Sequence, residues 1–269
     1  MAVDLAQYRQ RGYVVLDVLA PAELARLRAA ADALMAQPRY ANEHRFHYVS
    51  LLLPGGVEPT LLTALDHAGL LTAVTELLGG GPLIVDNAAL LAAAPGVSYR
   101  QGWHRDVLQV PESAIHDDMF SPRWVHNNVQ LNLALADDAA FWAVPGSHCR
   151  PNTAAEQAAF GGTKHMSPVD ATMPDGACLR LRAGQAALYN NNLIHRGYSD
   201  FTTPRRTLHF GYHSARRPPT WHFYNFDDTK LPAAHVASLP PATQRWMAAR
   251  LARRRAFPDV AASYRSGLA

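Results

Sequence analysis

The sequence is poor in cysteine and has no long apolar run. Its 269 residues include only Cys149 and Cys178, which we expect to be reduced thiols in a cytosolic protein. No apolar stretch reaches the roughly 18 residues that a membrane span requires, so no membrane association is expected. The first residues also lack a basic stretch followed by an apolar one, the pattern of a secretory leader. These absences together predict a cytoplasmic location.

Strong charge is also missing. The formal net charge is only +3, and charged residues make up 17% of the chain. Much of the positive charge lies at Arg250, Arg253, Arg254 and Arg255, near the C-terminus. No array of basic and aromatic residues accompanies these arginines, so we interpret them as the solvated face of a helix. Nucleic acid is therefore not an expected partner.

Hydrophobic residues make up 48% of the chain, enough for a substantial core. Helices are predicted from Pro21, over 59–78 up to the Gly79–Gly81 run, and over 242–255. Strands are predicted over 12–19, 83–91, 124–135, 141–144, 177–181, 186–189 and 207–212. There is no internal repeat, low-complexity tract or long linker. We expect one α+β domain, residues 1–269, built on a β-sandwich or open barrel.

The residues that carry chemistry are His104, Asp106 and His195. Two imidazoles and one carboxylate form the facial ligand set of a non-haem iron(II) centre, with three positions left open. Arg205 and Arg206 follow His195 and offer a guanidinium fork for a dicarboxylic acid. Zinc accepts the same three ligands, so a metal-dependent hydrolase or lyase is the alternative.

A His-Xaa-Asp pair is weak evidence alone, because the chain contains 13 histidines. A second pair occurs at His116 and Asp118, between a proline and an acidic doublet, and this context is typical of a loop. The pair at His104 instead follows an apolar run and sits in a short aromatic and polar stretch. The context therefore favours His104 and Asp106.

The predicted strand around residue 130 has two different faces. Asn128, Gln130 and Asn132 alternate with apolar residues, so the three amides share one face. That face is either exposed to water on a half-buried strand or lines a polar cavity inside the barrel. The metal motif nearby favours the cavity.

Four motifs in order resemble the phytanoyl-CoA dioxygenase family of iron(II)/2-oxoglutarate-dependent oxygenases, over nearly the whole chain. They are the opening strand 12–15 with the helix start 21–24, Trp103-His104-Arg105-Asp106, Val144-Pro145-Gly146-Ser147-His148, and His195 followed eleven positions later by Arg206. The resemblance implies a double-stranded β-helix, or jelly roll (cupin-like), with flanking α-helices. It implies an N-terminal helical flank over about 1–80, a core over about 82–215 and a C-terminal extension over about 216–269.

The resemblance also assigns roles. It makes His104, Asp106 and His195 the Fe(2+) ligands and Arg206 the partner of the distal carboxylate of 2-oxoglutarate. Arg205 is the alternative if the register differs by one residue. Gln130 is a further co-substrate contact, O2 is the third reactant, and His148 is expected to hold its turn rather than bind metal.

The chain departs from the family pattern at three places. Gly197 stands where the family has a small hydroxyl residue, and 92–94 is an alanine run where a polar residue is usual. The segment 138–143 replaces the usual lead-in to the Pro-Gly-Ser-His turn. The residues that make secondary contacts to the co-substrate are therefore not assigned, and Arg100 and Tyr189 are candidate replacements.

The intact Asp106 favours hydroxylation, desaturation or cyclisation, because the related halogenases lack this carboxylate. We expect a small-molecule metabolite or natural-product intermediate as substrate, and a non-catalytic binding protein is a further alternative. Several aromatic residues could line its pocket, although aromatic residues are usually part of the core. They are Trp103, Trp124, Phe141, Trp142 and the run 221–226. Arg100, Arg105 and Lys164 could favour an acidic substrate but are more typical of surface or ion-paired residues.

Overall fold

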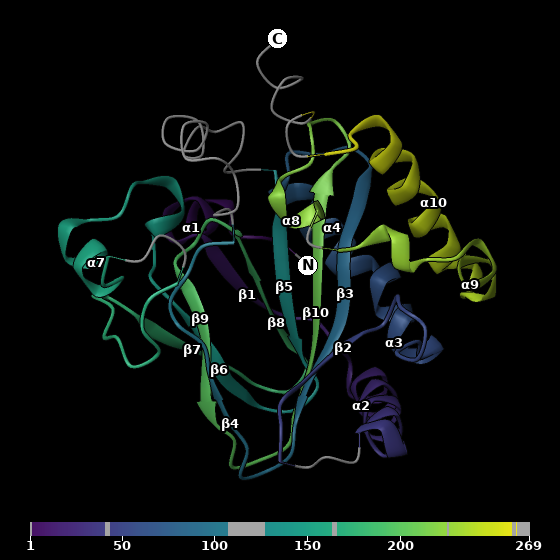
Figure 1. Ribbon diagram of the computed structural model, residues 1–269, viewed down its shortest axis with the longest axis horizontal. Coiled ribbons are helices and arrows are strands. Elements are labelled where there is room, and N and C mark those ends of the chain that lie inside the picture. Colours follow the sequence, from purple (N-terminus) through teal and green to yellow (C-terminus); the bar gives the residue numbers. More distant parts are fainter. Residues whose placement is uncertain are drawn as a thin grey trace.

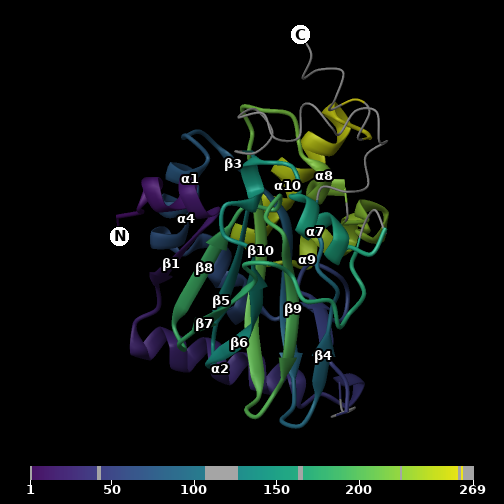
Figure 2. The ribbon, with the colours of Figure 1, turned by 90° about the vertical axis from the view of Figure 1, so that its left-hand side faces the viewer.

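Two antiparallel sheets face each other in the computed structural model, which describes residues 2–40, 44–106, 127–162, 166–224, 226–259 and 262 (Figures 1 and 2). The six-stranded sheet has the order β1 (Tyr13–Asp17), β8 (Gln185–Tyr189), β5 (Val129–Ala134), β10 (Arg205–Ser214), β3 (Leu83–Ala93), β2 (His47–Ser50). The four-stranded sheet has the order β4 (Ser98–Arg100), β9 (His195–Asp200), β6 (Asp138–Ala143), β7 (Ala177–Leu181). This is the predicted jelly-roll core.

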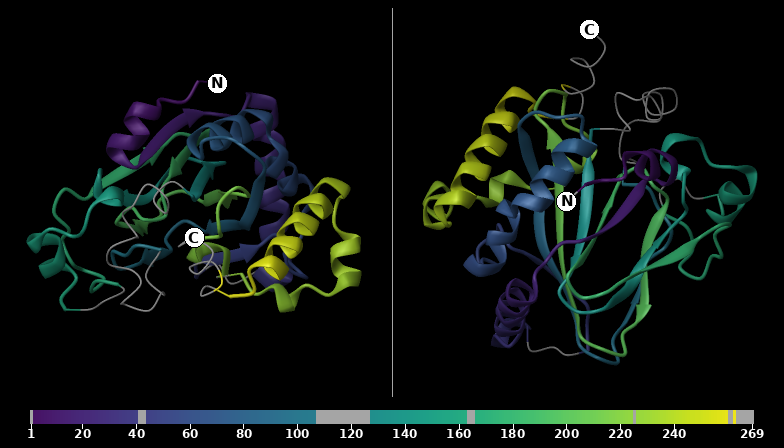
Figure 3. Two further views of the ribbon diagram at one scale, coloured as in Figure 1. Left: turned by 90° about the horizontal axis from the view of Figure 1, so that it is seen from above. Right: turned by 180° about the vertical axis from the view of Figure 1, so that it is seen from behind.

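Most helices cover the outer face of the six-stranded sheet (Figures 1 and 3). They are α2 (Pro21–Met35), α3 (Pro59–Leu62), α4 (Ala68–Leu77), α9 (Ala233–Ser238) and α10 (Pro241–Ala256); α1 (Leu5–Arg11), α7 (Ala154–Ala159) and α8 (Trp221–Tyr224) lie elsewhere. Leu131 and Leu133 of β5 pack with Leu27 and Leu34 of α2 in one apolar cluster. Because side chains alternate along a strand, Gln130 and Asn132 face the opposite way, between the two sheets.

The predicted helix over 59–78 is divided. A 3₁₀ turn at Thr63–Asp66 separates α3 from α4, and His67 between them has an extended backbone with ψ 112°. The His67 Nδ1 accepts a hydrogen bond from the Leu70 N–H at 3.2 Å, so His67 caps α4. The helix ends before Gly79–Gly81 as predicted, and all three glycines have positive φ.

The segment predicted as an N-terminal helical flank also contains two strands of the core. β1 pairs with β8, with Tyr13 opposite Tyr189, and β2 pairs with β3, with His47 opposite Ala92. The first 80 residues therefore supply both edge strands of the six-stranded sheet. Strands β2, β4 and β9 are not predicted from the sequence, because they are short or rich in polar residues and show no apolar alternation.

None of the helices in the described ranges is long and apolar enough to cross a membrane. Cys149 and Cys178 are both free, as expected.

Arg250 corrects the interpretation of the C-terminal arginines as a solvated face. Its side chain is fully buried and donates hydrogen bonds to the carbonyls of Val85, Asp86 and Phe223 at 3.0, 2.7 and 2.8 Å. It also pairs with Asp228, with 2.7 Å between Nε and Oδ1. This arginine therefore ties α10 to β3 and α8, whereas Arg255 on the same helix is exposed.

Arg250→Met is expected to lower the free energy of unfolding by about 3–5 kcal/mol, because it leaves three buried carbonyls without their donor and Asp228 with only its 3.4 Å contact to Arg254. Arg255→Met, on the exposed face of the same helix, should change it by less than about 0.5 kcal/mol. Urea unfolding of the two variants measures both values. Equal effects would show that Arg250 does not tie the helix to the sheet.

Candidate metal centre

His104, Asp106 and His195 come together at one point between the two sheets. The backbones of His104 and His195 exchange two hydrogen bonds of 2.9 Å, which sets the two imidazoles side by side with ring centroids 4.4 Å apart. The Nε2 atoms of His104 and His195 lie 3.4 and 3.6 Å from the two oxygens of Asp106. One ligand atom from each residue lies within 4.8 Å of the others, and no other such group occurs among the described residues.

The hydrogen bonds of the two imidazoles prepare them for a metal. His104 Nδ1 lies 3.0 Å from the Gly102 carbonyl, and His195 Nδ1 lies 2.9 Å from the Leu193 carbonyl. A carbonyl only accepts, so each Nδ1 carries the proton and each Nε2 presents a lone pair. Both lone pairs therefore converge on the Asp106 carboxylate.

A buried relay orients that carboxylate. Gln130 Nε2 donates to Asp106 Oδ2 at 2.5 Å, and the Tyr189 hydroxyl donates to Gln130 Oε1 at 2.9 Å. Gln130 and Tyr189 are buried and lie opposite each other on β5 and β8. Gln130, predicted as a co-substrate contact, thus holds a metal-ligand candidate, and Tyr189 supports it.

Protonation also suits metal binding. Burial lowers the pKa of His195 to about 4, against the opposing charge of Asp106. Burial would raise the pKa of Asp106, but the neighbouring His195 and His104 hold it well below its usual value. The pKa of His104 is raised because Asp106 outweighs the effect of burial. Asp106 and His195 are thus in their metal-binding forms at neutral pH.

The Pro-Gly-Ser-His turn supports the segment that leads into His195. Ser147 Oγ accepts from the Ile194 N–H at 2.8 Å, and Arg105 donates to the Ser147 carbonyl at 2.6 Å and to the Asn192 carbonyl. His148 is fully buried beneath Gly12 and lies outside the ligand cluster, as predicted. Arg105 is buried in this turn and does not face a substrate.

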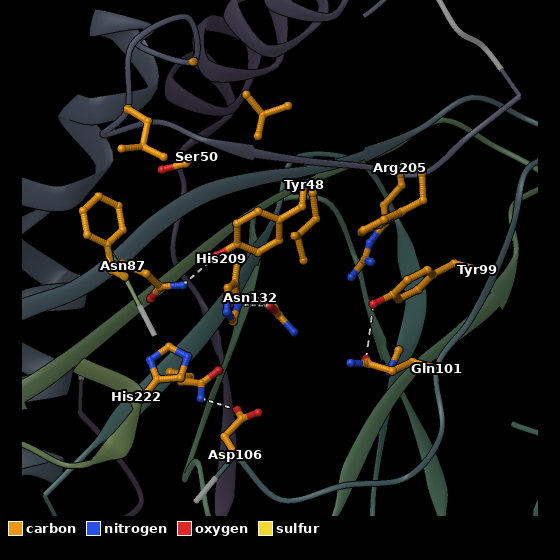
Figure 4. A pocket seen from close by; sticks show the side chains of 18 of the residues that line it. Tyr48, Ser50, Asn87, Tyr99, Gln101, Asp106, Asn132, Arg205, His209 and His222 are labelled. Carbon is orange, nitrogen blue, oxygen red and sulfur yellow. Dashed lines mark hydrogen bonds between the residues drawn. The ribbon is translucent and has the colours of Figure 1, made fainter. Parts of the chain in front are cut away.

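The three side chains line a cavity of about 650 Å³ between the sheets, in which Figure 4 shows the Asp106 carboxylate. Gln130 and Asn132 line it, which supports the cavity interpretation of this strand. Asn128 does not, because its Nδ2 donates to Asp86 Oδ2 at 2.7 Å in a separate buried cluster. Of the predicted aromatic lining residues, Phe141 and Phe226 line the cavity, while Trp103 and Trp142 pack around Arg196.

The two arginines after His195 point in opposite directions. Arg206 lies on the helix side of β10 and pairs with Asp32 of α2, with 2.8 Å between Nε and Oδ1. Arg205 is buried, lines the cavity and pairs through Nε with Asp138 Oδ2 at 2.9 Å. Of the two candidates, Arg205, the alternative register, thus lies at the cavity, and Arg206 lies away from it.

Asp138 is a functional candidate that the sequence analysis did not recognise. Besides Arg205, it accepts hydrogen bonds from the Ala140 N–H at 2.7 Å and from the Thr207 hydroxyl. These contacts fix the Arg205 Nε side, and the Nη atoms make no hydrogen bond within the described part of the chain. Figure 4 shows the guanidinium turned into the cavity beside Tyr99. In the sequence, Asp138 shows only as part of the segment 138–143, which departs from the family pattern.

The departure at Gly197 has a structural explanation. A Cβ at Gly197 would lie 2.3 Å from Cε1 of Tyr99, so the Tyr99 ring occupies the space of the missing side chain. Arg100 pairs with Asp200 and does not line the cavity. The second His-Xaa-Asp pair (His116 and Asp118), Trp124 and Lys164 lie outside the described residues, as does the side chain of Trp221.

The family model described as phytanoyl-CoA dioxygenase (PhyH) matches residues 8–207. The chain belongs to this family. It is therefore an enzyme of the oxygenase type, and the resemblance stated from the four motifs is confirmed. No curated protein matches the sequence significantly.

Solved structures share the family fold at low sequence identity. AviO1 from Streptomyces viridochromogenes Tue57 is 22% identical, with 80% of this chain and 96% of that chain covered and a TM-score of 0.60. HygX from Streptomyces hygroscopicus with nickel, 2-oxoglutarate and hygromycin B bound is 20% identical, with coverages of 79% and 87% and a TM-score of 0.58. The epimerase SnoN in complex with Fe3+, alpha ketoglutarate and nogalamycin RO is 21% identical, with coverages of 78% and 82% and a TM-score of 0.56.

Proposed function

We propose that this protein is an iron(II)/2-oxoglutarate-dependent oxygenase that hydroxylates, desaturates or cyclises a small metabolite or natural-product intermediate. The observation that carries the proposal is the convergence of two Nε2 lone pairs and one carboxylate beside a cavity that also contains Arg205. Family membership supports it, as do the iron and 2-oxoglutarate in the related SnoN structure.

The donor set fits ferrous iron. His104, Asp106 and His195 would hold the ion on one face, and the remaining positions would face the cavity. When bound, iron with 2-oxoglutarate and O2 supplies the oxidising power for attack on an unactivated C–H bond, with succinate and CO2 as co-products. Gln130 keeps Asp106 in place, and the buried rings of Phe141 and Tyr189 beside His195 exclude water from this part of the site.

Arg205 is suited to the far carboxylate of 2-oxoglutarate. A guanidinium fork binds a carboxylate through two parallel hydrogen bonds, and Asp138 occupies only the Nε side of this fork. Tyr99, hydrogen-bonded through its hydroxyl to Gln101 at 3.2 Å, lines the same end of the cavity. This end is called the co-substrate end below.

The substrate should be a small molecule. The cavity volume falls within the range of about 300–1,000 Å³ that is usual for such ligands. The related HygX structure contains hygromycin B, and SnoN is described as an epimerase that holds a nogalamycin compound. The presence of Asp106 favours hydroxylation, desaturation or cyclisation over halogenation.

Purified protein with Fe(II), O2 and 2-oxoglutarate is expected to form succinate even without added substrate, at a low rate. Replacing Fe(II) by Zn(II) should abolish this turnover, because zinc does not change oxidation state. Succinate is measured by chromatography, with anaerobic samples as the control. Succinate formation that is equal with both metals, or that does not depend on oxygen, would rule out the proposed function.

A further inference from the structure

The cavity has a second end, across from Arg205. In Figure 4, Arg205, Tyr99 and Gln101 lie on one side, Asn87 and His222 lie on the other, and Asp106 lies below and between them. Tyr48, Asn132 and His209 also line the cavity. We call the group Tyr48, Asn87, Asn132, His209 and His222 the polar end.

The side chains of the polar end are hydrogen-bonding groups, and none of them is a carboxylate, a lysine or an arginine. His209 Nδ1 lies 2.9 Å from Asn132 Oδ1; with that oxygen as acceptor, Nδ1 carries the proton and Nε2 is left as an acceptor. Burial lowers the pKa of His209 to about 3, so the ring is uncharged. Asn87 Nδ2 donates to the Tyr48 hydroxyl at 3.2 Å, which leaves the hydroxyl proton and a second amide N–H available. This end thus presents both donors and acceptors.

The cavity lining also contains one pair of opposite charges. Asp227 and Lys230 both line the cavity, and the Lys230 Nζ lies 3.6 Å from Asp227 Oδ2. Among the described lining residues, Arg205 is the only other permanently charged cation, and it belongs to the co-substrate end. An anionic substrate would therefore find no free positive partner at the polar end.

On these grounds we infer that the polar end binds a neutral, polyhydroxylated substrate, such as a sugar or cyclitol ring, and not an acyl chain or an acid. The inference rests on the proposed function, whose substrate class it names. A hydroxyl group both donates and accepts, so a polyol can satisfy the mixed donors and acceptors together. An alkyl chain would instead strip water from these groups and leave them without partners. The half-exposed ring of Tyr48 offers a flat apolar face for the C–H groups of such a ring.

Gly211 makes room for the polar end. It lies opposite Asn87 in the pairing of β10 with β3. A Cβ at Gly211 would lie 2.5 Å from Asn87 Oδ1 and 3.1 Å from His222 Nδ1. Gly211→Ala should therefore displace both side chains while removing neither, which complements a direct substitution of Asn87.

The test compares two sets of probes on the iron-loaded full-length protein with O2 and 2-oxoglutarate. The first set contains methyl glycosides, disaccharides and myo-inositol; the second contains palmitoyl-CoA, palmitate and short dicarboxylic acids. At least one member of the first set should raise succinate formation several-fold above the substrate-free rate, and no member of the second should. The inference is overturned if no polyol raises the rate or if an acyl or acidic probe raises it more. The substrate-free rate tests the proposed function separately, because it needs no polar end.

Variants of the cavity then test whether the polyol binds at the polar end. Asn87→Leu and Gly211→Ala should each raise the KM for the best polyol by about tenfold, the effect of one lost hydrogen bond to a buried group. They should change kcat less. Gln10→Leu, a substitution of an exposed amide on α1, should leave this KM within about twofold of wild type. Unchanged KM values in both cavity variants would overturn the assignment of the polyol to this end.

Discussion

Asp106→Ala is expected to reduce oxygen-dependent succinate formation by more than about 100-fold, because loss of an outer-shell partner alone often costs a metal site 10–100-fold. The substitution removes the only carboxylate of the ligand cluster and leaves two neutral donors. Metal content after iron loading, measured by atomic absorption, should fall together with the activity. Both readouts follow from a single cause, the loss of the ligand.

The chain provides a matched control for this substitution. Asp118 stands in the second His-Xaa-Asp pair, at the same spacing from its histidine. Asp118→Ala should retain both iron and activity. If Asp118→Ala removed the activity and Asp106→Ala kept it, the metal centre would be assigned to the wrong pair. Thermal unfolding of both variants separates loss of metal from loss of fold.

Arg205→Ala should raise the KM for 2-oxoglutarate by about 10- to 100-fold, since one partner of a charged hydrogen-bonded pair is worth about 1.5–3 kcal/mol. Arg206→Ala, the adjacent residue, should leave this KM within about twofold of wild type. Arg206 faces the helix side and pairs with the half-exposed Asp32, and such surface pairs contribute about 0–1 kcal/mol to stability. The measurement is the dependence of succinate formation on 2-oxoglutarate concentration.

Loss of Arg205 also leaves Asp138 buried without its cation, so the alanine variant is expected to be less stable. Arg205→Lys addresses this point. It keeps a positive charge for Asp138 but loses the planar fork, so the protein should stay folded while the KM for 2-oxoglutarate still rises. A normal KM in both Arg205 variants with a raised KM in Arg206→Ala would restore the opposite register.

The sequence itself indicates which of the two arginines faces the cavity side of the strand. In β10, Leu208 and Phe210 lie two and four residues after Arg206, so all three share one face. A face with buried leucine and phenylalanine packs against helices, which leaves Arg205 and His209 on the cavity side. The spacing from His195 differs by only one residue between the two arginines and does not distinguish them. The alternation of side chains along the strand does distinguish them.

Other features depend on contacts between distant parts of the chain. Arg250 resembles a solvated arginine on a polar helix, and its burial depends on carbonyls of Val85 and Asp86 more than 160 positions away. The polar end likewise combines Tyr48, Asn87 and His222 from three separate elements. Neither the burial of Arg250 nor the composition of the polar end can be inferred from the pattern of neighbouring residues in the sequence. The cluster of His104, Asp106 and His195 could be inferred, because the ordered motifs of the sequence predict that these three residues come together.

The measurement that tests the central claim most directly is an anaerobic titration followed by visible absorption. Protein loaded with Fe(II) should develop a charge-transfer band when 2-oxoglutarate is added, with saturation at one equivalent. Zn(II)-loaded protein should show none, and Asp106→Ala should lose the band with its iron. If 2-oxoglutarate produced no band in iron-loaded wild-type protein, His104, Asp106 and His195 would not form the centre proposed here.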